Sequence, residues 1–314
     1  MTNQPTKTNP DLERIIMLDF NNTEAALNIP TKLNFQPTFE PSRLDGHKFV
    51  INSATDEVVG HVGDTFTCAS HRDFFTGVWS QVTENLQPDD VEGVKFTFKD
   101  GRHNAFGMMD IQLPSITSEI VTTNGHTTKL AQRIIALHSV DGGRGSNTTL
   151  FGNIDFFCLN GQVSGEYSTV RQKNTSNFSM DRFINQLRQS KNDFYAQSEQ
   201  LKQFAQTELA DSTVKRLLDS MLNTGNVDLE GRRRNVETKA DKMMKLYRDE
   251  VAVRGANKFA LVSAFSNYAT YADDRNGFGL RNTANKNETA ATSMVTRELE
   301  VNKWMSDSRF LEAA

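Results

Sequence analysis

Two tight-turn signals, each between strand-like runs, constrain the fold of this chain more than any other feature. The first is Asp100-Gly101, which lies between the runs VKFTF and NAFGMMDIQL. The second is Asn124-Gly125, which joins SEIVTT to TKLAQRIIALHS. Asp-Gly and Asn-Gly favour two-residue type I′ turns, whose twist matches that of antiparallel strands. Residues 94–139 are therefore predicted to form successive antiparallel strands, a β-meander.

Further strands are predicted upstream, in the runs KFVINSA, VVGHV and DTFTCA, with a turn at Thr55-Asp56. Ser70 is a predicted N-cap with Asp73 three residues later, so a helix should follow and end near Pro88. This helix would cover the sheet. The apolar run LFGNIDFFCL can be a buried strand or a helix, because periodicity alone does not separate the two.

After Ser179 the hydrophobic period becomes helical. Leu187, Phe194 and Leu201 recur seven apart on one face of a long predicted helix that ends near Leu209. Shorter helices are predicted at 212–223, 235–253, 257–272 and 288–305, with a loop at 273–287. The predicted fold class is α+β, an antiparallel β-meander covered by helices and followed by a helical C-terminal region. The predicted divisions are a tail and docking segment (1–44), an α+β core (45–210) and a helical region (211–314).

The charge of the chain is unevenly distributed. The net charge is -4, but residues 94–191 hold 11 Lys and Arg against 7 Asp and Glu, whereas residues 1–93 hold 6 against 14. The middle third is thus the only net-basic part, although its excess is modest beside that of ordinary DNA-binding domains. The sequence has neither an apolar run long enough for a membrane span nor the pattern of a signal peptide. We therefore expect a protein of the host-cell cytoplasm.

No pattern in the sequence indicates catalysis. Cys68 and Cys158 lie in apolar runs, where burial would raise a thiol pKa, so free thiols are expected and a zinc site is not. The glycine-rich loop at 142–146 lacks the Lys-Ser/Thr pair of a phosphate loop. The six histidines are scattered and show no spacing typical of a metal site. A metal site made of three histidines from different strands stays open as an alternative. The carboxylates of the basic third, such as Asp100 and Asp141, are better explained as turn residues. We expect no enzyme activity, cofactor or metal.

The stretch from Leu137 to Asn177 carries a resemblance to a known family. An apolar run ends in an Asp-Gly turn, a second one ends in Cys-Leu-Asn-Gly, and a basic segment follows. Together with VVGHVGDTFTCASHRDFF upstream, it resembles a family of phage- and plasmid-borne proteins catalogued as a domain of unknown function. The resemblance covers residues 45–210, with weaker helical similarity to about 305. The chain departs from the family at Val140, where His is expected, and at 172–175, where the family has Arg-His-Thr.

The resemblance implies a recombination protein of a mobile element, with an architecture similar to the annealing proteins of the Rad52-like superfamily. In this reading, basic side chains line a groove that holds single-stranded DNA by its phosphates, while Tyr167 and Phe178 stack on unpaired bases. The predicted phosphate contacts are Lys95, Lys99, Arg102, Lys129, Arg133, Arg144, Arg171, Lys173, Arg182, Arg188 and Lys191. An ordinary solvated surface with ion pairs is the alternative for these residues. The arginines at 232–234 are a second candidate, with self-paired charge as the alternative.

The leading hypothesis is therefore a phage or plasmid single-stranded DNA-binding and annealing protein that acts in homologous recombination without a nucleotide. It would work as a homo-oligomer, a ring or filament, because one short groove holds too few nucleotides. A partner nuclease is possible in such systems. The alternative is a non-enzymatic interaction protein of a mobile element, a host-takeover or anti-defence factor, whose acidic N-terminal third faces a basic partner.

Overall fold

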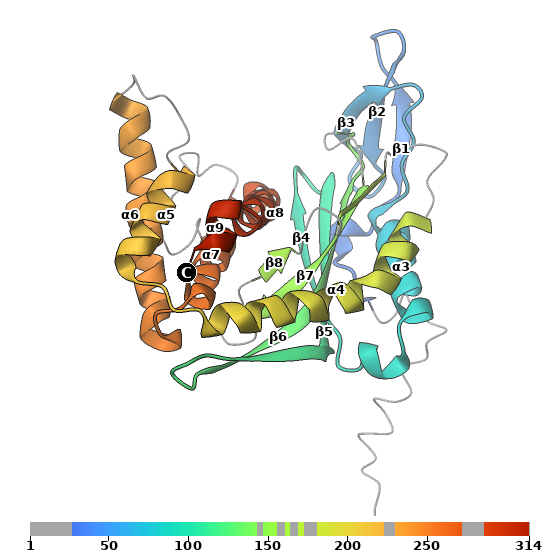
Figure 1. The fold of residues 1–314 in the computed structure, drawn as a ribbon. Coiled ribbons are helices and arrows are strands. Elements are labelled where there is room, and N and C mark those ends of the chain that lie inside the picture. Colours follow the sequence, from blue (N-terminus) through green and yellow to red (C-terminus); the bar gives the residue numbers. More distant parts are fainter. Residues whose placement is uncertain are drawn as a thin grey trace, which may run out of the picture.

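The computed structural model describes residues 27–142, 147–155, 161–163, 169–172, 181–222, 230–271 and 286–313. Strands fill the N-terminal half of this part and helices follow to the C-terminus (Figure 1). The predicted α+β class is confirmed. The predicted N-terminal tail and most of the loop at 273–287 lie outside the described residues.

A six-stranded antiparallel sheet forms the centre of the molecule. Its strands are β4 (Lys95–Gly101), β5 (Phe106–Val121), β6 (Thr127–Ser139), β7 (Asn147–Asp155), β8 (Gly161–Val163) and β9 (Thr169–Gln172). The order is β4-β5-β6-β7-β8, and β9 pairs with the other half of β7. The predicted meander is thus confirmed over β4 to β6, and β7 continues it. The run from Leu150 to Asp155 is a strand, because it pairs with β6 on one side and with β8 and β9 on the other.

The two predicted turns have different outcomes. Asn124-Gly125 does reverse the chain between β5 and β6, with Gly125 at φ +82° and the Asn124 side chain accepting from the His126 N–H. The prediction for Asp100-Gly101 is wrong. Both residues remain in β4, and the turn follows at 102–104, where three consecutive residues take φ of 50°, 52° and 67°.

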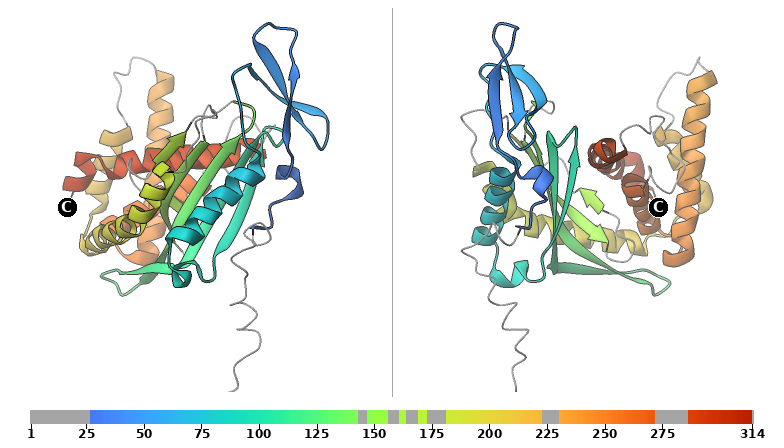
Figure 2. Two further views of the ribbon diagram at one scale, coloured as in Figure 1. Left: turned by 90° about the vertical axis from the view of Figure 1, so that its right-hand side faces the viewer. Right: turned by 180° about the vertical axis from the view of Figure 1, so that it is seen from behind.

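Helices cover both faces of the central sheet. The helices α3 (His71–Asn85) and α4 (Asp181–Gln206) lie side by side on one face, here called the α4 face (Figure 2). The predicted capping box of α3 is confirmed, since Ser70 Oγ accepts from the Asp73 N–H and Asp73 accepts from the Ser70 N–H. The helix α8 (Lys286–Met305) crosses the opposite face, here called the α8 face. Because both faces are covered, β6 is almost wholly buried over its second half.

A smaller three-stranded sheet projects from one end of the central sheet (Figure 2). It consists of β1 (Pro37–Pro41), β2 (His47–Asn52) and β3 (Glu57–Gly63) in antiparallel order. The turn at Thr55-Asp56 is confirmed, with Asp56 at φ 56°. The predicted strand DTFTCA is wrong, because residues 64–69 form no strand. The predicted boundary at residue 45 falls inside this sheet, between β1 and β2.

The C-terminal half is helical as predicted. Beyond α4 the helices are α5 (Asp211–Leu222), α6 (Glu230–Arg254), α7 (Lys258–Tyr271), α8 and a short α9 (Ser308–Glu312); the chain also has 3-10 turns η1 (Thr31–Leu33) and η2 (Pro88–Val91). The sequence did not predict β1 or α9. None of the described helices is long and apolar enough to cross a membrane.

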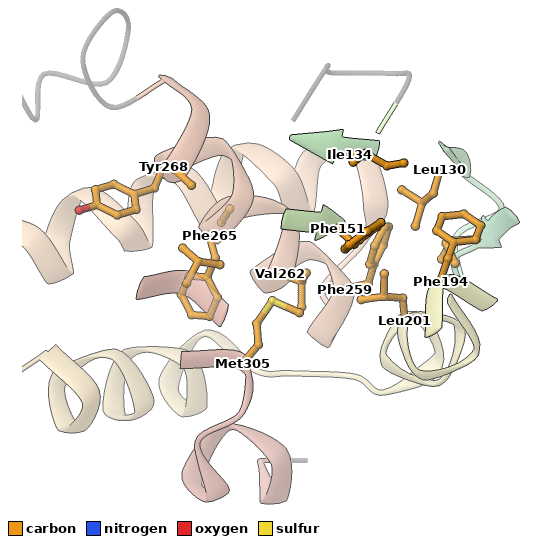
Figure 3. Packing of buried hydrophobic residues seen from close by; sticks show 14 of the residues in the cluster. Leu130, Ile134, Phe151, Phe194, Leu201, Phe259, Val262, Phe265, Tyr268 and Met305 are labelled. Atoms are coloured by element: carbon orange, nitrogen blue, oxygen red, sulfur yellow. The ribbon is translucent and has the colours of Figure 1, made fainter. Parts of the chain in front are cut away.

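The helical half shares its core with the sheet. One cluster of buried apolar side chains extends from Leu27 to Phe310, through both sheet and helices. In Figure 3, side chains from the sheet, α4 and α7 converge, among them Phe151, Leu201 and Phe259. Polar contacts add to this, because Asn124 Nδ2 at the tip of the β5–β6 hairpin donates to the carbonyl of Val253 at the end of α6.

Candidate nucleic-acid interface

The helix α4 carries several basic side chains on its outer surface. Its buried stripe includes Phe183, Leu187, Phe194 and Leu201, which pack into the core. The predicted seven-residue recurrence is therefore confirmed as the inner face of this helix. A helix with one face fixed in this way must present the remaining positions outward.

One flank of α4 carries three cations and a tyrosine at helical spacing. They are Arg188, Lys191, Tyr195 and Lys202, here called the α4 strip, and each is exposed or half-buried. Steps of three, four and seven residues keep side chains on the same side of a helix. At about 1.5 Å of rise per residue, the strip is roughly 21 Å long. The α4 strip is therefore a straight row about as long as a few nucleotides of an extended strand.

Polar neighbours orient the cations of the strip. Arg188 Nε donates to Asn85 Oδ1 at 3.1 Å, at the end of α3. Lys191 Nζ lies 2.7 Å and 2.8 Å from the two carboxylate oxygens of Asp90 in η2. Lys202 pairs with Glu199 one turn earlier on α4. The strip is therefore positioned by α3 and η2 as well as by its own helix.

Both lysines of the strip form ion pairs with which a bound anion must compete. The Lys202–Glu199 pair is exposed and contributes about 0 to 1 kcal/mol because water and salt screen it. Asp90 has only 14% of its side chain exposed, so its pair with Lys191 is partly buried and holds that ammonium group more firmly. Tyr195 lies between the cations, with 41% of its surface exposed and its ring edge-on to Phe194 at 5.3 Å. An exposed aromatic ring among cations suits a base next to its phosphates.

Arg133 is not available to DNA, which corrects its predicted role. It is 4% exposed on the α8 face, where Nε donates to Asp110 and Nη1 donates to Glu298 Oε1 at 2.9 Å. Burial by itself would lower the pKa of this guanidinium, but the two carboxylates outweigh burial and raise it. Burial raises the pKa of Glu298 despite its contact with Arg133. The cluster fastens α8 to the sheet.

Other predicted contacts lie away from α4. Lys99 is on the α8 side of β4, with Nζ 3.8 Å from the sulfur of Met294 in α8. Lys95 is exposed four residues earlier on the same strand, and alternation places it on the same face. Lys129 is exposed opposite Glu119 in the pairing of β5 and β6. Arg102 lies in the turn after β4 and pairs with Asp141 at 2.9 Å.

The predicted single groove is therefore not assembled within the described part of the chain. Of the α4 residues, Arg188 and Lys191 belong to the strip, whereas Arg182 is exposed on a different side of the helix. Arg171 occupies the β9 position opposite Thr148. The remaining predicted contacts lie outside the described residues: Arg144, Tyr167, Lys173 and Phe178. The basic residues are distributed over both faces of the sheet.

Tyr195 and Lys202 were missed by the sequence reading. The signal was available, because once 187, 194 and 201 are assigned to the inner face, 188, 195 and 202 must lie next to them along one flank. Tyr195 is one of the few large apolar side chains that the described residues leave exposed. The predicted contacts end at Lys191 and do not extend along the rest of α4.

A buried pair of histidines between α3 and β6 does not form a reactive site. His71 Nε2 donates to the carbonyl of Asn104, so its Nδ1 is left to accept from the Nδ1–H of His138 at 2.8 Å. Burial lowers the pKa of His71 to about 4, and burial together with His71 lowers that of His138. Both rings are therefore neutral near pH 7. They stabilise the contact between helix and sheet.

The other candidates for chemistry are the cysteines, the metal-binding side chains and a pocket. Burial raises the pKa of the Cys68 thiol to about 12, as expected from its apolar run, while Cys158 lies outside the described residues. No group of three or more His, Cys, Asp or Glu among the described residues could hold a metal ion. A small pocket lies between Leu130, Leu201 and Phe259, and its carboxylate, Asp155, is paired with the buried Arg254 at 2.7 Å.

Residues 58–299 match the model of a protein family described as a domain of unknown function, DUF932. No curated protein and no solved structure matches the chain. The match begins inside β3, so β1 and β2 precede it, while the central sheet and α3 to α7 lie within it.

Proposed function

This chain belongs to the DUF932 family, and we propose that it binds single-stranded DNA along the α4 strip. The observation that carries the proposal is the alignment of Arg188, Lys191, Tyr195 and Lys202 on one exposed flank of a rigidly packed helix. The cations would hold phosphates and Tyr195 would stack on an unpaired base. Stacking on an exposed ring requires an unstacked base, which favours a single strand over a duplex.

The proposal extends to annealing. The strip contacts only a few nucleotides, so a complementary strand would be held in register only if several copies placed their strips along one strand. We therefore propose a homo-oligomer acting in recombination of a mobile element, in the cytoplasm of its host and without a nucleotide. The arrangement of an antiparallel meander beneath a long helix is compatible with a Rad52-like annealing protein, although that relationship rests on architecture alone.

The test is a salt-titrated binding measurement with an unstructured oligonucleotide. The double change Arg188→Ala and Lys202→Ala should weaken binding to every sequence and flatten the salt slope by about 1.4, at about 0.7 per lost phosphate contact on a single strand. Tyr195→Ala should weaken binding by roughly five-fold or more, since stacking contributes about 1 to 3 kcal/mol per base. Tyr195→Phe should retain most of the affinity.

A matched control comes from α5, where Lys215 and Arg216 are both exposed. Changing these two to Ala removes the same charge from another helix, and the salt slope should remain that of the native protein. Equal slopes for the two double variants would show that only net charge matters and would refute the α4 strip. Absence of salt-dependent binding in the native protein would favour the alternative, an interaction protein without a DNA role.

A further inference from the structure

The small three-stranded sheet exposes a row of rings where a solvated sheet normally has polar side chains. The strand register places Glu40, Phe49 and His61 directly opposite one another across β1, β2 and β3. The rings of Phe49 and His61 have centroids 5.0 Å apart, and His47, two residues before Phe49, lies 5.2 Å from His61. These four residues are here called the ring face. Glu40, His47 and His61 are exposed and Phe49 is half-buried.

The opposite face of the same sheet is the one that packs on the body of the protein. Val50 and Val62 are buried there, and a Cβ on Gly142 would lie 3.1 Å from Val62. At the base of the sheet, Gly60 is in contact with the backbone of Asp141. The sheet is thus fixed by one face and one end. Its ring face is turned away from that attachment.

The charge around the ring face decides what it can bind. Residues 37–64 carry five exposed carboxylates and two cations. The carboxylates are Glu40, Asp45, Asp56, Glu57 and Asp64, and none forms an ion pair within the described part of the chain. One of the two cations, Lys48, is held on the other face, with Nζ 2.8 Å from the carbonyl of Asp64 and 4.4 Å from the centre of the Phe39 ring. A phosphate backbone would be repelled here, even though the rings could stack on bases.

We propose that the ring face is a docking surface for an arginine-containing basic segment of a partner protein. A guanidinium group can stack on Phe49 or on an imidazole ring and donate to Glu40 at the same time, because these groups share one row. The surrounding carboxylates add long-range attraction for a basic segment. The contact of Lys48 with Phe39 shows that aromatic rings of this sheet already hold a cation.

Most of the ring face lies outside the residues that match the family. The match begins at residue 58, so Glu40, His47 and Phe49 lie before it and only His61 lies within it. The proposal concerns a surface separate from the α4 strip and does not depend on DNA binding.

The test uses the histidine ring signals of the full-length protein in proton–carbon NMR spectra. Addition of an alternating arginine–glycine peptide should shift the ring signals of His47 and His61 in a saturable way and leave those of the buried His71 and His138 in place. A lysine–glycine peptide of equal length should bind more weakly, because lysine is more strongly hydrated and does not stack as a plane. Phe49→Ser should weaken binding by about two- to five-fold, the value of an exposed cation–π contact.

Two further variants test the ring face with substitutions that should leave the fold intact. Glu40→Gln and His61→Ser change exposed side chains only, and each should weaken peptide binding while leaving the signals of the buried His71 and His138 in place. Glu199→Gln on α4 is the matched control for removal of one exposed carboxylate, and it should bind the peptide as the native protein does. Unchanged His47 and His61 signals, equal binding by all variants, or the same shifts on adding a single-stranded oligonucleotide would each overturn the proposal.

Discussion

At the scale of single residues, burial decides which cations serve structure and which can serve binding. Arg133 and Arg188 both belong to the net-basic third of the sequence. Arg133 is buried against Asp110 and Glu298, whereas Arg188 is exposed and donates to the neutral Asn85. Sequence alone does not separate the two, because the partner Glu298 lies 165 residues away from Arg133.

Arg133→Ala should destabilise the protein strongly. The change leaves Asp110 and Glu298 buried without their counter-charge, which costs about 3 to 5 kcal/mol of unfolding free energy for a broken buried pair. Urea unfolding measures the loss, and Arg188→Ala should stay within about 0.5 kcal/mol of the native value as an exposed control. If Arg133→Ala were stable but no longer bound DNA, the result would show that Arg133 contributes to DNA binding as first predicted.

The histidine pair predicts a loss of stability in mild acid. The pKa of His71 is lowered to about 4 and that of His138 is also lowered, so below about pH 6.5 the unfolded chain takes up protons that the folded chain does not. Stability should therefore fall as the pH drops from 6.5 toward 4, by about 1.4 kcal/mol per pH unit for each group. Urea unfolding at several pH values measures this slope.

His138→Leu isolates one member of the pair. Removing one titrating group should reduce the slope between pH 6.5 and 5 by about 1.4 kcal/mol per pH unit, whatever the variant does to stability at neutral pH. If the native protein and His138→Leu showed the same slope, the acid sensitivity would have to come from other groups.

At the scale of elements, the contact between η2 and α4 sets how much charge the α4 strip offers. Asp90 neutralises Lys191, which has 36% of its side chain exposed. Asp90→Asn should free this ammonium group for a phosphate. We expect tighter binding of single-stranded DNA and a salt slope steeper by about 0.7, the value of one added contact. Asp89→Asn, an exposed neighbour in η2, should change binding less. Equal effects of the two changes would argue against a specific role of Lys191.

Local patterns predicted the elements well where local chemistry decides the conformation. The Asn124-Gly125 turn and the capping box at Ser70 depend on side chains a few residues apart. The Asp100-Gly101 prediction was wrong because the pairing of β4 with β5 continues as far as Gly101 opposite Phe106, which moves the turn to 102–104. Tyr195 could have been found from helix periodicity, but the burial of Arg133 beneath α8 could not.

At the scale of the whole molecule, the core does not divide where the sequence suggests. Chain composition indicates a core ending near residue 210, and a chain ending near Asn223 would then keep its fold. In the structure, Phe259 and Val262 of α7 belong to the same buried cluster as Ile134 and Phe151 of the sheet. The backbone of Leu209 also donates to the carbonyl of Ala256. The two predicted units share one core.

A chain truncated after Leu222 should therefore fail to fold. It lacks α6 to α9, so Leu130, Leu201 and other side chains of the shared cluster become exposed, which favours aggregation. Soluble yield and circular dichroism of the truncated chain test this expectation. A soluble, folded product that still binds single-stranded DNA would show that the sheet and α4 are independent of the helical half.

The ion pair between Arg133 and Glu298 also sets an order of events during synthesis on the ribosome. The two residues are 165 positions apart, and α8 is the last long helix to be made. At a synthesis rate of about 5 to 20 residues per second, the segment from Arg133 to Glu298 takes roughly 10 to 30 s to make. Arg133, Asp110 and the apolar side chains around them stay uncovered by α8 for that time. The part of the α8 face around Arg133 therefore stays uncovered until α8 has been made, and chaperones that recognise apolar surface have that interval in which to act.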